Sequence, residues 1–108
     1  MPITEFLVVT TTTETEADAQ KIAKDVVEKH LAACAQVFGP IQSYFWWEGQ
    51  VQQEAEWRCD LKTRIEIFDD LVKAIEEIHP YDVPQIISKP IAAASKEYLD
   101  WLEKETNR

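Results

Sequence analysis

The chain has 108 residues, 45% of them hydrophobic, and a formal net charge of −9 at pH 7. This length suits one domain, so residues 1–108 are treated as a single folding unit. The acidic balance disfavours nucleic acids and anionic membranes as partners, because both are held mainly by Lys and Arg, and no apolar run approaches the ~18 residues of a membrane span.

The first part of the chain predicts a strand followed by a helix. Residues 3–9 form an apolar run rich in β-branched side chains, typical of a buried strand, and the threonines at 10–13 extend it. Residues 13–16 fit a capping box. The apolar stripe of the helix consists of Ala19, Ile22, Ala23, Val26, Val27, His30 and Leu31. We expect a structural role for His30 near the end of this stripe.

A long β-hairpin follows. Residues 33–47 read as an extended segment, with a bulge or corner expected at Gly39-Pro40 and a turn at Glu48-Gly49. Residues 51–62 alternate with a period of two, which predicts a strand with one mostly apolar and one polar face. The first face carries Val51, Gln53, Ala55, Trp57, Cys59 and Leu61, and the second carries Gln52, Glu54, Glu56, Arg58, Asp60 and Lys62.

The last part predicts a second helix, an edge strand and a terminal helix. Residues 63–66 fit another capping box, and the helix after it ends at His79-Pro80, because the residue before a proline avoids helical angles. Its apolar stripe is Phe68, Leu71, Val72, Ile75 and Ile78. Prolines flank a strand at residues 83–91, which suits a free edge. Ser95 is the expected cap of the terminal helix.

This order predicts an α+β fold: a ferredoxin-like β-α-β-β-α-β sandwich with a long β-hairpin and a C-terminal helix. Helices of about four turns shield only about 24 Å of strand, whereas hairpin strands of roughly 12 to 15 residues reach about 40–50 Å. The hairpin tip therefore projects, and it carries Tyr44, Phe45, Trp46 and Trp47, with Trp57 on the returning strand. We expect these rings to be buried against other copies of the chain rather than folded into their own core.

Several segments together are similar to the CutA divalent-cation tolerance family. They are Leu31-Ala32-Ala33-Cys34-Ala35, Tyr44-Phe45-Trp46-Trp47-Glu48-Gly49, Leu61-Lys62-Thr63, His79-Pro80-Tyr81-Asp82-Val83-Pro84-Gln85-Ile86-Ile87 and Tyr98-Leu99-Asp100-Trp101-Leu102. The resemblance covers nearly the whole chain. It implies an intertwined homotrimer, a link to divalent-metal tolerance, reported copper binding and a regulatory role like that of trimeric PII proteins, with no established catalytic activity.

The same resemblance implies copper ligation by a cysteine at the end of the first strand and by a tandem histidine before the proline. This sequence has Thr11 at the first position and Ile78-His79 at the second, so His79 is the remaining metal candidate. Glu48, Glu54 and Asp82 would add only oxygen donors, whereas Cu(II) prefers several nitrogen or thiolate donors. The alternative for His79 is a cap at the end of the second helix.

The candidate ligand pocket combines Lys62, His79, Tyr81 and Trp47. Lys62 lies on the polar face of a strand close to the second helix, and an ordinary exposed lysine is the alternative there. His79 and Tyr81 lie in the loop after that helix, where functional groups are common. The leading hypothesis is therefore a homotrimeric small-ligand or metal-responsive binding module, with copper as the metal that the resemblance implies.

Three other classes of function are compatible with the predicted topology: a scaffold, an acylphosphatase-type enzyme and an RNA-binding domain. The runner-up is a structural trimer that anchors partner proteins without any ligand. An acylphosphatase-type enzyme would need an arginine and a backbone cradle after the first strand, but residues 10–16 contain neither Arg nor Gly, and no other catalytic motif is present. RNA stacking on the sheet aromatics is disfavoured by the acidic charge. We therefore expect no enzymatic activity.

The expected compartment is the cytoplasm. The first residues do not form the basic segment followed by an apolar run that is typical of a signal peptide. Cys34 and Cys59 form no CxxC pair and lie among apolar neighbours, so buried free thiols are predicted.

Overall fold

The computed structural model describes residues 5–107, and within them the predicted order of elements is confirmed. The strands are β1 (Phe6–Thr13), β2 (Cys34–Trp47), β3 (Gln50–Arg64) and β4 (Ile87–Pro90). The helices are α1 (Glu16–Glu28), α2 (Phe68–Ile78) and α3 (Lys96–Glu105), with a 3₁₀ turn at Ile65–Ile67. None of the helices in this part of the chain is long and apolar enough to cross a membrane. Ile3 and Thr4, predicted as strand, lie outside the described residues.

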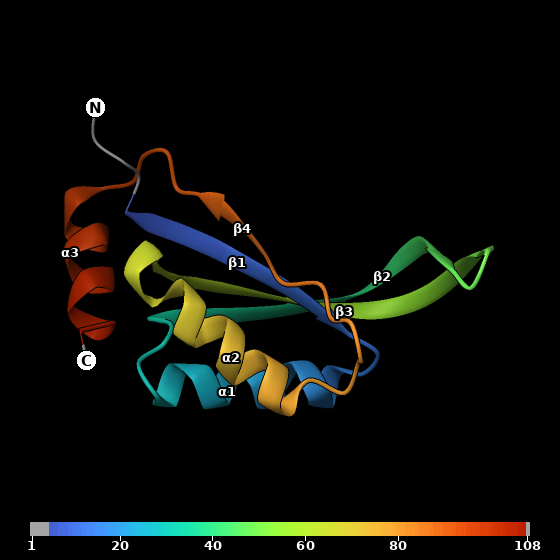
Figure 1. The fold of residues 1–108 in the computed structure, drawn as a ribbon. Helices are drawn as coiled ribbons and strands as arrows, with labels where there is room; N and C mark the ends of the chain where they lie inside the picture. Colours follow the sequence, from blue (N-terminus) through green and yellow to red (C-terminus); the bar gives the residue numbers. More distant parts are fainter. Residues whose placement is uncertain (1–4, 108) are drawn as a thin grey trace.

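The strands of residues 5–107 form one antiparallel sheet in the order β2-β3-β1-β4, as the ferredoxin-like prediction requires. Figure 1 shows α1 and α2 side by side against the sheet, with α3 at the end opposite the hairpin tip. β4 is an edge strand, which confirms the inference from its flanking prolines. It is shorter than predicted, because residues 83–86, which include Pro84, form a loop.

The core lies between the sheet and the two helices. Its side chains come from the predicted stripes and from the inner face of β1 and β3, and those with at most 1% exposure include Val9, Ile22, Val26, Cys59, Leu61, Leu71 and Ile75. The alternation of β3 therefore separates a buried from an exposed face only where helices cover the sheet. Nearer the turn, both Val51 and Ala55 are exposed.

Both predicted capping boxes were wrong in detail. The N-cap of α1 is Thr15 rather than Thr13: the Thr15 hydroxyl accepts the Asp18 N–H at 3.1 Å. Thr63 does not cap a helix, because β3 continues past it and its buried hydroxyl donates to the Leu31 carbonyl at 2.7 Å. Ladder pairing with β1 therefore overrides the local helix signal, and the 3₁₀ turn delays α2 until Phe68.

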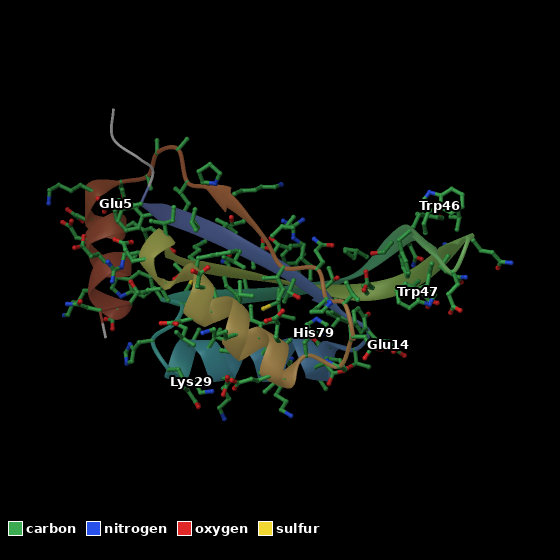
Figure 2. All side chains as sticks on the ribbon, in the orientation of Figure 1. Glu5, Glu14, Lys29, Trp46, Trp47 and His79 are labelled. Atoms are coloured by element: carbon green, nitrogen blue, oxygen red, sulfur yellow. The ribbon has the colours of Figure 1, made fainter. Side chains whose placement is uncertain are left out.

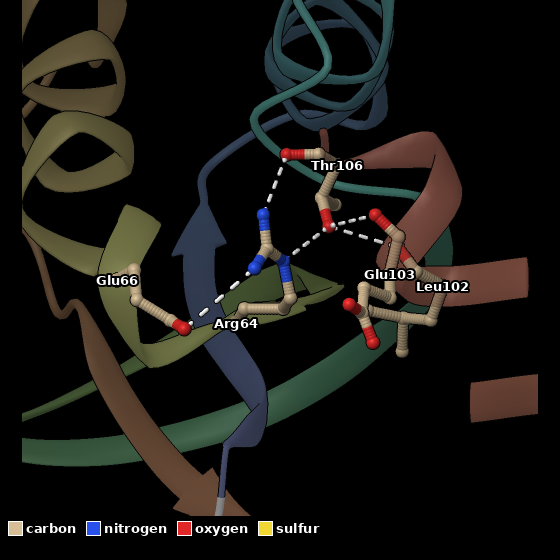
Figure 3. A network of polar contacts seen from close by, with 5 residues as sticks. All are labelled: Arg64, Glu66, Leu102, Glu103 and Thr106. Carbon is tan, nitrogen blue, oxygen red and sulfur yellow. Dashed lines mark hydrogen bonds and ion pairs between the residues drawn. The ribbon is translucent and has the colours of Figure 1, made fainter. Parts of the chain in front are cut away.

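Ser95 does cap α3, since its Oγ accepts the Tyr98 N–H at 3.4 Å. The other end of α3 is held by Arg64, which donates from Nε to Thr106 Oγ1 at 2.8 Å and from Nη2 to the Thr106 carbonyl at 3.1 Å (Figure 3). The Thr106 hydroxyl in turn donates to the Leu102 carbonyl at 2.8 Å. A cation at a helix C-terminus is electrostatically favourable, so this network fixes α3 to the sheet.

The prediction that His30 lies on the buried stripe was wrong. α1 ends at Glu28, and His30 has a φ of 59° in the turn that follows, where its side chain is exposed. Its Nδ1 donates to the Glu105 carbonyl at 2.7 Å. His30 therefore has a structural role, but at the end of α3 rather than in the core.

The hairpin extends past α1 and α2, and we call its outer part, residues 41–56, the arm (Figure 1). The expected irregularity at Gly39-Pro40 is confirmed by a register shift between Phe38 and Ile41. A Cβ at Gly39 would lie 3.0 Å from the Trp57 ring, so only glycine fits there without displacing the ring. The turn is confirmed as well, with positive φ angles at Glu48 and Gly49.

The arm aromatics do not fold back into the core of their own chain. Tyr44 is 67% exposed and Trp46 74%, and Phe45 and Trp47 are exposed too. Trp57 differs, because it lies inside the sheet and packs against the core. Residues 50–56 of β3, which precede Trp57, have no pairing with β1, so the arm is a two-stranded ribbon.

Thr11 offers a test of the packing. Its hydroxyl is fully buried and has no hydrogen-bond partner, although the residue lies in β1 opposite Cys59. We expect Thr11→Val to raise the free energy of unfolding by about 1 kcal/mol, because an unsatisfied buried donor is removed without a change of shape. Urea denaturation at one fixed protein concentration measures this.

Thr63→Val is the matched control, because Thr63 is equally buried in a strand but donates to the Leu31 carbonyl. This substitution should lower the free energy of unfolding by roughly 1–2 kcal/mol. Shifts of the same sign for both variants would contradict the assignment.

Candidate ligand groove beside the arm

A groove of about 940 Å³ lies between the arm and the loop that follows α2. This volume is within the usual range for small-molecule sites. Its walls come from the end of β1, the arm and residues 81–85. The groove therefore joins the aromatic part of the hairpin to the loop in which two of the predicted site residues lie.

Strand register decides which arm side chains share a face. Phe45 pairs with Gln52, and Trp47 pairs with Gln50. Directly opposed residues of an antiparallel pair point to the same side, and neighbours along a strand alternate. Phe45, Trp47, Glu54 and Glu56 therefore share one face, which we call the groove face, and all of them line the groove.

The opposite face of the arm, which we call the outer face, carries Tyr44, Trp46 and Val51, because Trp46 pairs with Val51. Figure 2 shows Trp46 and Trp47 on opposite sides of the ribbon. The outer-face side chains are the more exposed ones, with 74% for Trp46 against 51% for Trp47. Tyr44 and Trp46 also border the groove, so the two faces differ in exposure but meet at its rim.

Tyr81 holds the loop wall of the groove in place. Its hydroxyl donates to Glu56 Oε2 at 2.8 Å, and its ring lies against that of His79 with centroids 4.8 Å apart. Burial, together with the neighbouring Glu56 carboxylate, raises the pKa of Tyr81 well above its usual range. The hydroxyl therefore remains a neutral donor. Glu56 lies on the face predicted to be polar, but it is only 7% exposed because the loop packs over it.

His79 is buried, and its ring packs against the Tyr81 ring. Its Nε2 lies 2.8 Å from the Thr12 carbonyl, and its Nδ1 accepts the Tyr81 N–H at 3.1 Å. A carbonyl can only accept and an N–H can only donate, so the neutral ring carries its proton on Nε2. Burial lowers the pKa of His79, partly offset by the bond to Thr12 and by the charges of Asp18 and Glu56.

The alternative prediction for His79, a cap at the end of α2, is confirmed for its backbone. Both ring nitrogens are already hydrogen-bonded, so the ring has no lone pair free for a metal in this conformation. The ring does not cap α2 either, because it reaches across to β1. Only the backbone N–H of His79 serves the helix, by donating to the Ile75 carbonyl at 2.8 Å.

The copper site implied by the family resemblance does not fit the residues of one chain. Thr11 lies in the core, and burial raises the pKa of the Cys59 thiol opposite it to about 12. Within residues 5–107, no group of three or more His, Cys, Asp or Glu side chains is placed to hold a metal ion.

The structure brings together three of the four predicted site residues. Trp47 and Tyr81 line the groove, and His79 packs against Tyr81. Lys62 lies elsewhere: its Nζ is 5.5 Å from the centre of the Tyr98 ring of α3. The sequence reasoning did not assign Glu14 and Glu56 to the site. The alternation of β3 groups Glu56 with Glu54, but nothing local indicates that a loop 25 residues later covers it.

The groove is acidic. Glu14, Glu54, Glu56 and Asp82 line it, and no Lys, Arg or His does so among the described residues. Such a lining favours cations and disfavours phosphate-bearing ligands. Among the described residues that line the groove there is no Cys to act as a nucleophile and no His to activate a hydroxyl.

Comparisons with known proteins agree with the fold and the sequence segments. The family model "CutA1 divalent ion tolerance protein" matches residues 7–105. The divalent-cation tolerance protein CutA of Archaeoglobus fulgidus is 41% identical over 87 residues, which cover 81% of this chain and 84% of that protein. The chloroplastic CutA 1 of rice is 36% identical over 100 residues, and the match spans 93% of this chain but 56% of the rice protein.

A solved structure shows the same fold. The divalent cation tolerance protein (Cut A1) of Thermus thermophilus superposes with a TM-score of 0.92 and 38% identity, covering 94% of this chain and 99% of that one.

The buried His79 predicts a pH-dependent stability. Its pKa in the folded protein lies below the ordinary value of 6.5, so the unfolded chain binds more protons as the pH falls through that value. We expect the free energy of unfolding to decrease from about pH 7.5 to about pH 5.5, and His79→Gln to weaken this decrease. Urea denaturation at both pH values measures the difference.

His30→Gln is the control, because His30 is the only other histidine of the chain and is exposed. An unchanged pH dependence in His79→Gln, or an equal change in both variants, would refute the role assigned to His79.

Proposed function

The chain belongs to the CutA1 divalent ion tolerance protein family, and from this premise we propose that it works as a homotrimeric binding module without a catalytic step. The observation that supports association of chains is the outer face of the arm, and the number three comes from the family resemblance. Tyr44, Trp46 and Val51 are each more than half exposed and lie together on a ribbon that no helix covers. Burial of one such side chain contributes about 1.5–3 kcal/mol, so association of chains through this face is energetically favourable.

The backbone of the arm supports association as well. β3 pairs with β1 only from Trp57 to Arg64, so residues 50–56 present one edge that pairs with no strand in the described part of the chain. An open strand edge favours pairing with a strand of another chain. We propose that arms and sheet edges of sister subunits combine in this way.

Within such a trimer, we propose that the groove is the ligand site of a regulatory module, comparable to the trimeric PII proteins. Two of the four sequence-predicted site residues, Trp47 and Tyr81, line it, and Tyr81 is fixed by Glu56 and His79. We further propose a cytoplasmic location, which is consistent with the free thiols of Cys34 and Cys59. Fractionation of cells tests the location.

Scaffolding for partner proteins is the second candidate, because the same exposed aromatic face offers an anchor. The two candidates differ in what the groove does. If the chain is only a scaffold, substitutions on the groove face leave partner capture intact, and no small ligand binds.

Assembly is tested by Trp46→Lys, which places a charge in the centre of the outer face. We expect the mass in solution to fall from three times 12.5 kDa towards that of one chain, because a buried unpaired charge costs several kcal/mol per subunit. Light scattering after size-exclusion chromatography measures the mass. Ile65→Lys is the control, since Ile65 is also exposed but lies in the 3₁₀ turn away from the arm. A wild-type protein of single-chain mass would overturn the trimer.

A copper response, if it involves direct binding, requires donors from more than one subunit, because the described residues of one chain provide no suitable cluster. We therefore expect His79→Gln to leave the copper affinity of the assembled protein unchanged within about twofold, since less than ~0.4 kcal/mol is then at stake. Isothermal titration with Cu(II) measures this. A large loss of affinity in a variant that remains folded and assembled would restore His79 as a ligand.

A further inference from the structure

The groove carries negative charge, which disfavours an anionic ligand and gives no electrostatic gain to a neutral one. Its carboxylates come from separate elements: Glu14 follows β1, Glu54 and Glu56 lie on β3, and Asp82 lies in the loop after α2. No basic side chain within residues 5–107 lines the groove to neutralise them. An occupant that carries positive charge is therefore favoured electrostatically.

The aromatic side chains narrow the class of cation. Phe45 and Trp47 share the groove face with Glu54, and Tyr81 forms part of the opposite wall. Aromatic faces attract weakly hydrated organic cations, above all alkylated ammonium groups. They are no ligands for Ca²⁺ or Mg²⁺, which need six or more converging oxygens, and no such cluster occurs in the described residues.

One wall of the groove is preorganised. Glu56 is more than nine-tenths buried, and its Oε2 accepts the Tyr81 hydroxyl at 2.8 Å. The Tyr81 ring in turn lies on His79, whose two nitrogens are both hydrogen-bonded. These contacts hold the loop and the arm in fixed positions relative to each other before any ligand binds, which reduces the entropic cost of binding.

We propose that this groove is a binding site for a small organic ammonium ion. The carboxylates supply the charge, and Phe45, Trp47 and Tyr81 supply apolar and aromatic contacts to the alkyl groups around the nitrogen. This role rests on the groove remaining open in the assembled protein. It deepens the proposed binding function by assigning a ligand class, and it requires no metal ion.

The test uses a matched pair of probes. Choline carries a quaternary ammonium group, and 3,3-dimethylbutan-1-ol has the same shape with a neutral carbon in place of the nitrogen. We expect choline to give saturable binding heat and a saturable change in tryptophan fluorescence, with an affinity at least about tenfold above that of the alcohol. Titrations are done at constant ionic strength, so that general screening is not mistaken for binding.

Two substitutions locate the site. Glu54→Gln removes one charge from the groove face and should weaken choline binding by roughly fivefold. Trp47→Leu should weaken it by a similar factor, about two- to fivefold, because it removes an aromatic face. Glu76→Gln is the matched control, since it removes the same charge from an exposed position of α2 outside the groove, and it should leave the affinity unchanged.

The outcomes separate this inference from the proposed assembly. Light scattering is recorded for each variant, and a thermal midpoint confirms folding. Equal affinities for choline and the alcohol, or equal effects of Glu54→Gln and Glu76→Gln, would overturn the ammonium site. So would the absence of saturable binding across the millimolar range in a protein of trimeric mass, while the trimer itself would stand.

Discussion

The fold depends on a mismatch of lengths between strands and helices. β2 and β3 have 14 and 15 residues, whereas α1 and α2 have 13 and 11. Because a strand rises about 3.3 Å per residue and a helix only about 1.5 Å, the strands are more than twice as long as the helices that cover them. Within residues 5–107 of one chain, the outer half of the hairpin therefore has neither helices nor a third strand beside it, and its apolar side chains remain in water.

The two faces of the arm carry different side chains, and the two proposed roles are based on this difference. In the covered part of β3, alternation simply separates core from surface, as Leu61 and Lys62 illustrate. In the arm, the same period of two separates Trp46 on the outer face from Trp47 on the groove face. The proposed association therefore relies mainly on the outer face and the proposed ligand site on the groove face, although Tyr44 and Trp46 border the groove as well.

Periodic patterns predicted the elements well, because each depends on residues close in sequence. The hairpin turn at Glu48-Gly49, the end of α2 before Pro80 and the cap at Ser95 are examples. The errors arose where distant residues decide. Thr63 looks like a helix cap until pairing of β3 with β1 is known, and Glu56 looks exposed until Tyr81 covers it. Lys62 was likewise predicted to share a pocket with His79, but it faces Tyr98 of α3 instead.

The positions at which the resemblance predicts copper ligands have structural roles in this chain. Thr11 is part of the pairing of β1 with β3, but its hydroxyl makes no hydrogen bond in the core. His79 connects the Thr12 carbonyl to the Tyr81 backbone and supports the Tyr81 ring, which in turn holds Glu56. Both ring nitrogens are hydrogen-bonded, so coordination of an ion would first have to break one of these buried bonds. His79 is the one implied donor present in this chain, and in this conformation its ring supports the wall of the groove and offers no free nitrogen.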